Sequence, residues 1–134
     1  NTVVLWGDFT LSARRLAELL EATPTRREVR VVNSACYSGG FAELAFAGAD
    51  PERGAAPHRC GLFAAPADDV SSGCDPNPDR RVQDGYGLHF LHALRGEARD
   101  GTPLPPAAVD FDGDGTITLL EAHTRARIAS RSFD

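Results

Sequence analysis

The chain has 134 residues, of which 42% are hydrophobic, so its length and composition suit about one globular domain with a single core. Its 19 acidic and 14 basic residues give a formal net charge of −5, and the basic residues are scattered arginines, which argues against a nucleic-acid or anionic-membrane surface. No apolar run approaches the roughly 18 to 20 residues that a membrane helix needs, and the sequence does not open like a signal peptide.

The first third of the sequence predicts a β-α-β unit. Val3 to Leu5 is typical of a short strand. Apolar residues then recur at the spacing of one helix face, at Phe9, Ala13, Leu16 and Leu20. Thr10 or Ser12 can cap this helix, and Thr23-Pro24 ends it, because a residue before proline avoids helical angles. Val29 to Asn33 follows as a buried strand.

The start of the sequence indicates a piece cut from a longer protein. The whole sequence contains no Met, not even at position 1, and its first segment, NTVVLW, begins inside a strand-like run. Domain boundaries usually fall in exposed linkers rather than inside strands. Whether a targeting segment lies upstream of Asn1 therefore remains open.

A cysteine lies where the second strand should end and a helix begin. It is Cys36, within the segment VVNSACYSGGFAE from Val31 to Glu43. Ser38 is a candidate N-cap for that helix, whose inward face would comprise Phe41, Leu44 and Ala45. The positive end of a helix dipole lowers the pKa of a nearby thiol from its usual value of about 8.5. Cys36 is therefore the first candidate for chemistry.

The middle of the chain predicts a third strand, a long loop and a helix. Cys60 to Ala65 is expected to lie parallel to the first two strands, with helices crossing over between them. The segment Pro66 to Arg81 is rich in Pro, Ser, Asp and Gly and predicts a loop, which should share a rim with the Cys36 loop. Tyr86 to Leu94 predicts a short helix.

The three cysteines leave the redox compartment open. Cys60 and Cys74 can pair and leave Cys36 as a thiol, which would suit an oxidising compartment such as the periplasm or the outside of the cell. The alternative is three reduced cysteines in a cytoplasmic protein.

The last segment, VDFDGDGTITLLEA, has the spacing of a twelve-residue calcium loop. Its expected ligand positions are Asp110, Asp112, Asp114, Thr116, Thr118 and Glu121, with Gly115 at the sharp turn. The helix that normally precedes such a loop is excluded by Pro103, Pro105 and Pro106. We therefore predict a structural Ca²⁺ site that holds a C-terminal helix, Leu119 to Ala129, on the domain. The predicted division is 1–102 for the α/β domain and 103–134 for the calcium loop and helix.

Several motifs together resemble the caspase-like cysteine peptidases, with a pattern closest to the legumain type. They are SACYSGG after a strand, the strand GLFAA, the serine loop DDVSSGCDP, and DGYGLHFL opening a helix. The resemblance implies an α/β fold with a three-layer α/β/α arrangement and a mostly parallel sheet. It also implies an endopeptidase in which Cys36 attacks a peptide carbonyl and forms a thioester, with a peptide or protein as substrate.

The same resemblance implies a base and a specificity pocket. The family's catalytic His, followed by Gly, lies about 40 to 50 residues upstream of the cysteine, and no His precedes Cys36 here. The pocket positions correspond to Ser34, Ser71 with Ser72, and Asp84, although the family commonly has Gln, Glu or Asp at the position of Ser34. Asp84 would favour a basic or amide-bearing substrate side chain, or it could simply cap the following helix.

Four alternatives stay open. The chain could be a catalytically inactive, calcium-stabilised interaction domain in which Cys36 is a small buried residue. His89 and His92, spaced i, i+3, could share a metal, and any of the four histidines could in principle serve Cys36 as its base. An unrelated flavodoxin-like domain would need a phosphate-binding glycine loop after the first strand, and LWGDFTLS is not one.

Overall fold

A parallel strand pair and a helix pair form the two structural centres of the chain. The computed structural model describes residues 2–4, 7, 9–23, 27–73, 79 and 82–130. The chain folds as two compact units, 1–69 and 70–134. The protein is thus a mixed α/β protein, with one antiparallel and one parallel two-stranded sheet among the described residues.

The first unit begins with a hairpin rather than with a β-α-β unit. Strand β1 (Thr2–Val4) pairs antiparallel with β2 (Thr10–Ser12), and Val3 lies opposite Leu11. Only five residues separate the two strands, whereas a parallel connection needs about a dozen or more. The predicted parallel alignment of the first strand is therefore wrong. Phe9, assigned to the helix face, precedes β2 and is 73% exposed.

Helix α1 (Ala13–Ala22) is capped by Ser12, one of the two predicted candidates, and confirms the predicted stop. The Ser12 hydroxyl accepts a hydrogen bond from the Arg15 amide at 3.1 Å, which satisfies one of the unpaired donors of the first turn. The helix ends at Ala22, next to the predicted Thr23-Pro24 stop, of which Pro24 lies outside the described residues.

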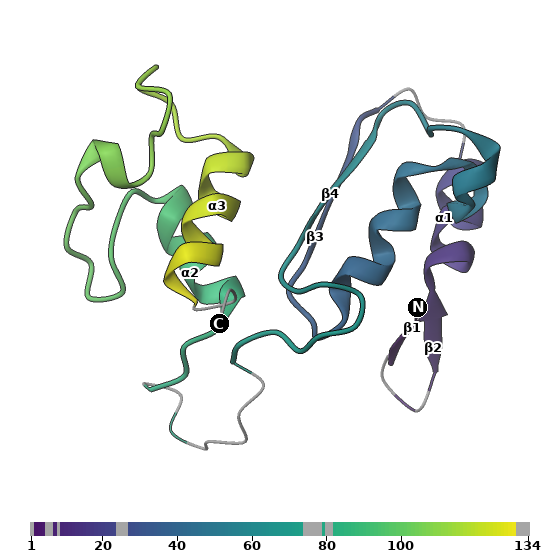
Figure 1. The fold of residues 1–134 in the computed structure, drawn as a ribbon, viewed down its shortest axis with the longest axis horizontal. Helices are drawn as coiled ribbons and strands as arrows, with labels where there is room; N and C mark the ends of the chain where they lie inside the picture. Colours follow the sequence, from purple (N-terminus) through teal and green to yellow (C-terminus); the bar gives the residue numbers. More distant parts are fainter. Residues whose placement is uncertain are drawn as a thin grey trace. The chain divides into compact units, whose positions relative to one another are not determined.

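Strands β3 (Val29–Asn33) and β4 (Arg59–Phe63) run parallel and side by side (Figure 1). Val29 lies opposite Arg59 and Asn33 opposite Phe63, so the two strands share both ends. The parallel alignment of these two segments is confirmed. Burial alternates along β3, and Val32 is 43% exposed, so the strand is covered on one face rather than buried on both.

A short helical segment lies between this strand pair and α1 (Figure 1). It is the 3₁₀ helix η2 (Ser38–Ala45), followed by η3 (Ala47–Ala49) and η4 (Pro51–Arg53). The core of the first unit comprises Ala13, Ala17, Phe41, Leu44 and Ala49, with Val3, Leu16, Val31 and Phe63 packed against it. The predicted inward face is correct for Phe41 and Leu44 but wrong for Ala45, which is exposed.

The second unit is centred on two packed helices, α2 (Tyr86–Leu94) and α3 (Leu119–Ala129), both with the predicted bounds. Tyr86 stacks on Phe90 with ring centroids 5.8 Å apart, and its hydroxyl lies 2.8 Å from His123 Nδ1 on α3. Between the helices, the described chain contains the 3₁₀ turn η5 (Pro106–Ala108), as expected from the prolines there. Helix α2 packs on α3, and both lie in the second compact unit, which begins at Val70. The domain boundary at 102/103 stays a prediction.

Candidate functional site

The turn that carries Cys36 follows directly from the end of β3. Asn33 is the last residue of the strand, and its side-chain oxygen accepts a hydrogen bond from the Ala35 amide at 3.0 Å. Such a local bond favours a turn over a continued strand. Tyr37 then adopts a left-handed conformation with φ 58°, and the Tyr37 amide donates to the Asp69 carbonyl at 2.8 Å. The backbone on both sides of Cys36 is thereby held.

A second set of contacts ties this turn to the segment after β4. Ser38 is 1% exposed, and its hydroxyl accepts from the Ala65 amide at 3.1 Å and lies 3.4 Å from the Ala65 carbonyl. The Gly39 amide donates to the same carbonyl at 2.8 Å. A Cβ at Gly39 would lie 2.8 Å from backbone atoms of the 65–67 segment, so the close approach requires glycine. The hydrogen bonds and the close backbone approach therefore account for Ser38 and Gly39 in structural terms.

Ser34, Cys36 and Tyr37 of this turn have accessible side chains. Ser34 is exposed, and Cys36 is partly exposed rather than buried. The alternative in which Cys36 is a fully buried core residue does not describe its environment. A partly exposed thiol in a fixed backbone is accessible to a reactant and restricted in its direction of attack.

The helix expected after Cys36 differs from the one found. The sequence predicted an α-helix capped by Ser38, whereas η2 is a 3₁₀ helix whose N-cap is Tyr37, without a side-chain cap bond. The Ser38 hydroxyl is unavailable as a cap because it binds Ala65. The α-helix whose dipole was expected to act on the Cys36 thiol is therefore absent from this position.

His58 lies at the opposite end of the strand pair from Cys36. It immediately precedes Arg59, which starts β4 opposite Val29, whereas Cys36 follows the last pair, Asn33 and Phe63. Five residues of parallel strand span about 16 Å. His58 is the one histidine in the sequence of the first unit, so this unit does not supply Cys36 with an imidazole.

In the second unit, the serine loop and the start of α2 lie against each other. A Cβ at Gly73 would lie 2.6 Å from Gly85 Cα, and one at Gly85 would lie 3.3 Å from the Ser72 carbonyl oxygen. Ser71 is 2% exposed, and the Ser72 hydroxyl is buried with no hydrogen-bond partner in the described part of the chain. Three of the four predicted pocket residues, Ser71, Ser72 and Asp84, thus come from one local region.

The acidic residue of this region has a partner that the sequence did not indicate. Asp84, which lies just before α2, binds through Oδ1 to Nε2 of His89 on that helix. The alternative assignment of Asp84 as the helix N-cap is wrong, because the N-cap is Gly85. His92 lies near a different acid, with its Nδ1 3.4 Å from Glu97 Oε1. Among the described residues, the cluster of three or more potential metal ligands that the structure contains includes neither His89 nor His92.

The predicted calcium loop curls as its spacing suggests. Asp110 accepts hydrogen bonds from the amides of Gly113, Asp114 and Gly115, and Gly115 takes the left-handed φ of 84°. One carboxylate oxygen from each of Asp110, Asp112 and Asp114 lies within 4.8 Å of the others. Oxygen clusters of this kind suit a hard cation, although exposed acidic groups also occur without one.

The Glu121 carboxylate accepts hydrogen bonds from both ends of the loop. It is 7% exposed, and its Oε1 accepts from the Phe111 amide at 2.7 Å while its Oε2 accepts from the Thr118 amide and hydroxyl, both at 2.8 Å. These bonds, led by the one from the Thr118 amide, lower the pKa of the Glu121 carboxyl. Glu121 and Thr118 form a capping box for α3, and the Glu121 carboxylate is not among the three clustered oxygens. Ligation by Glu121 would require it to turn toward them.

The sequence did not predict one pocket that the structure shows in the first unit. Two of its charged residues, Glu21 and Arg59, are joined by an ion pair although 38 positions separate them in the chain. No local motif marks a pair at that separation. A weak signal was present in TRRE and HRC, where charges flank two apolar strands.

Comparisons add no relative for this chain. No helix of the described residues has both the length and the apolar character needed to cross a membrane. Searches against protein-family models, curated proteins and solved structures found no match. The class defined by the fold is accordingly that of a mixed α/β protein with one parallel strand pair.

Proposed function

We propose that the chain carries the nucleophile-bearing part of a caspase-like cysteine endopeptidase, with a three-layer α/β/α fold of which β3 and β4 would be sheet strands. The observation that supports this best is the environment of Cys36. The thiol is partly exposed just beyond a parallel strand, in a turn that is held by bonds to Ala65 and Asp69. The ends of parallel strands are where open α/β sheets place their sites.

The chemistry would follow the usual course of thiol acyl transfer. The Cys36 thiolate attacks a peptide carbonyl, the carbon–nitrogen bond breaks, and the amine leaves with a proton from a general acid. Water then hydrolyses the thioester and regenerates the thiol. Ser34, Ser71, Ser72 and Asp84 are the proposed substrate-binding residues, and the Asp84 carboxylate, partnered by His89, would favour a cationic or amide side chain.

Selective thiol labelling tests the nucleophile. We expect a peptide bearing an acyloxymethyl ketone to modify Cys36 in the intact, reduced protein, as mapped by mass spectrometry. Cys60 is an internal control, since it is more exposed than Cys36 but lies within β4. Cys36→Ala should abolish labelling, and Cys60→Ser should leave it unchanged. Labelling that follows exposure, with Cys60 modified first, would contradict the proposal.

We also propose a structural Ca²⁺ site in the loop from Asp110 to Glu121. The expected ligands are the carboxylates of Asp110, Asp112, Asp114 and Glu121, with Thr116 and Thr118 at the two intermediate positions. The support is the convergence of the three aspartates together with the left-handed Gly115. Ca²⁺ is preferred to Mg²⁺ because a flexible set of six or more oxygens suits the larger ion.

Calorimetric titration tests the metal site. Asp114→Asn should weaken Ca²⁺ binding by at least about tenfold, since removal even of groups that only support a ligand costs that much. Asp68→Asn, an exposed aspartate of the first unit, is the matched control and should bind as the parent does. Equal binding by both variants would place the ion elsewhere.

A second candidate function is a non-catalytic interaction domain of the same fold, stabilised by Ca²⁺. The observation that favours it is the position of His58, which leaves the first unit without an imidazole for Cys36. On this alternative, Ca²⁺ raises the melting temperature while Cys36→Ala changes neither activity nor partner binding.

A further inference from the structure

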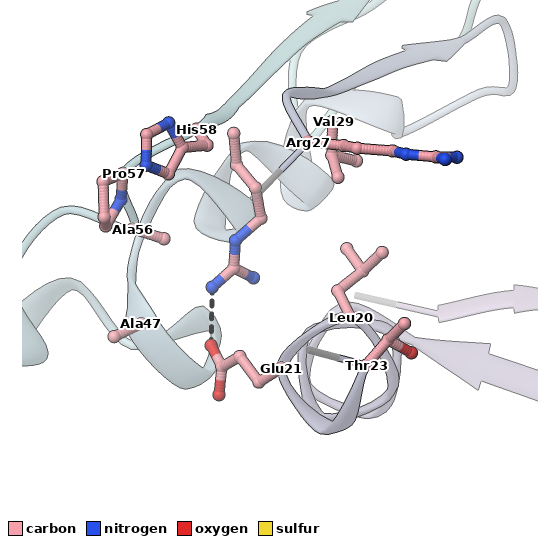
Figure 2. Close-up of a pocket in the computed structure, with 10 residues that line it drawn as sticks. Leu20, Glu21, Thr23, Arg27, Val29, Ala47, Ala56, Pro57 and His58 are labelled. Atoms are coloured by element: carbon pink, nitrogen blue, oxygen red, sulfur yellow. Dashed lines mark hydrogen bonds and ion pairs between the residues drawn. The ribbon is translucent and has the colours of Figure 1, made fainter. Parts of the chain in front are cut away.

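A pocket of about 410 Å³ lies at the end of the β3–β4 pair away from Cys36. Figure 2 shows it between the last turn of α1, which contributes Leu20 and Glu21, and the segment that leads into β4, which contributes Ala56, Pro57 and His58. Much of the wall is aliphatic. The polar part of the wall includes one largely covered arginine side chain, that of Arg59.

Arg59 is held rigidly from one side. Its side chain is 9% exposed, and its Nη2 donates to Glu21 Oε1 at 2.5 Å, the contact drawn as a dashed line in Figure 2. The same Glu21 oxygen accepts from the Gly48 amide at 2.7 Å. The guanidinium is therefore oriented before any ligand arrives, which reduces the entropy that binding must overcome.

The other terminal nitrogen of Arg59 has unused donor capacity. Nη1 is buried and has no hydrogen-bond partner within the part of the chain that the structure describes. Leaving a charged donor dehydrated and unpaired is costly, and such groups are normally satisfied. A ligand acceptor in the adjoining pocket would remove that cost.

The charges around the pocket favour an anion. Arg59 and Arg27 contribute two positive charges and Glu21 one negative charge, so the lining is net positive with His58 neutral. In Figure 2 the Arg27 side chain extends away from Glu21, so its charge does not lie beside the ion pair. An arginine placed in this way adds positive potential without competing for Glu21.

We propose that this pocket binds the carboxylate of a small molecule with an apolar body. The carboxylate accepts from Arg59 Nη1, and the apolar body packs against Leu20, Val29 and Pro57. Nη1 is covered by protein atoms, so the carboxylate reaches it as side chains of the wall move aside. Arginine matches a carboxylate in shape as well as charge, and aliphatic walls disfavour a fully hydrated ion such as phosphate.

NMR titration of the intact ¹⁵N-labelled protein tests this proposal with benzoate, benzamide and inorganic phosphate. We expect saturable shifts for benzoate at the Arg59 Nε–H and the Gly48 amide. Benzamide has the same shape without the charge and should bind roughly ten- to hundredfold more weakly, the usual effect of losing a charged hydrogen bond. Equal binding of benzamide, tighter binding of phosphate, or no saturable shift with benzoate up to its solubility limit would overturn the proposal.

Variants locate the interaction. Arg59→Lys keeps the charge but removes Nη1 and should weaken benzoate binding about tenfold or more. Arg27→Gln should weaken it by a few-fold, with a smaller dependence on salt. Arg30→Gln, which removes an exposed arginine of the same sheet outside the pocket, should bind benzoate as the parent does. If Arg59→Lys does not fold, two other results decide whether the pocket binds a carboxylate. They are the comparison of benzoate with benzamide on the parent protein and the effect of Arg27→Gln.

Discussion

At the scale of single residues, the Cys36 turn is held by contacts that its neighbours make. Asn33, Ser38 and Gly39 are each explained by a hydrogen bond or a close backbone approach. The contribution of these contacts to stability can be tested without reference to any activity.

Gly39→Ala should destabilise the first unit. The added Cβ would meet three backbone atoms at 2.8 Å, and backbone cannot move aside as a flexible side chain can. We expect a loss of about 1 to 3 kcal/mol in the free energy of unfolding, measured by urea titration. Ser34→Ala, an exposed change in the same turn, should remain within about 0.5 kcal/mol of the parent. A tolerated Gly39→Ala would show that the 65–67 segment does not approach the turn this closely.

Glu21 should give the stability of the first unit a dependence on acid pH. The Gly48 amide, followed by Arg59, lowers the pKa of this carboxyl below its ordinary value of 4.5. The unfolded chain therefore takes up a proton at a higher pH than the folded one. The stabilisation is present above about pH 4.5 and is lost as the pH falls through the folded pKa.

The measurement is the difference in unfolding free energy between the parent and Glu21→Gln across the acid range. Because the Glu21 side chain is 40% exposed, the difference near neutral pH should be below about 1 kcal/mol, and it should shrink toward zero in acid. Ser34→Ala, an exposed change that removes no ionisable group, should give a difference that does not vary in this way. A constant difference for Glu21→Gln would exclude the linkage.

At the scale of elements, the second unit depends on the contact between α2 and α3. Tyr86 is 1% exposed, and burial raises its pKa to about 12, so its hydroxyl stays protonated and can donate to His123 Nδ1. The ring also stacks on Phe90 and meets the His123 ring edge-on. One side chain thus joins both helices.

Tyr86→Phe keeps the ring packing and removes the hydroxyl. We expect a loss of about 0.5 to 1.5 kcal/mol in stability, because His123 Nδ1 is left without this partner. Tyr37→Phe is the matched control, since Tyr37 is 54% exposed and should tolerate the change. Thermal unfolding followed by circular dichroism compares the two variants. Equal melting temperatures would mean that water replaces the bond at no cost.

At the scale of the whole molecule, the two units should respond differently to Ca²⁺. The proposed ligands belong to the second unit, where Glu121 also caps the helix that packs on α2. A ligand stabilises only what folds with its site, by about 2.7 kcal/mol at a concentration 100 times the Kd. We therefore expect Ca²⁺ to slow amide hydrogen exchange in α2 and α3 but not in β3 and β4.

The control for this exchange experiment is Asp114→Asn, in which the slowing should disappear at the same Ca²⁺ concentration. Mg²⁺ should have a smaller effect than Ca²⁺ on the parent protein. Protection that spreads equally over both units would show that they unfold together.

Local sequence patterns by themselves determined the elements whose signals are contained in a few neighbouring residues. These are the cap at Ser12, the strand Val29–Asn33, the helices Tyr86–Leu94 and Leu119–Ala129, and the curl of the acidic loop. Caps, prolines and spacing act over one or two turns, so they can be recognised without knowing the partner segments.

Only the tertiary structure decided the features that depend on distant partners. The antiparallel pairing of the first strand, the use of Ser38 to bind Ala65 instead of capping an α-helix, and the ion pair of Glu21 with Arg59 each involve a second segment. A side chain has one set of hydrogen-bonding atoms, and the three-dimensional arrangement determines which segment uses them. For the same reason the sequence could indicate Cys36 as a candidate nucleophile, but not which atoms hold it in place.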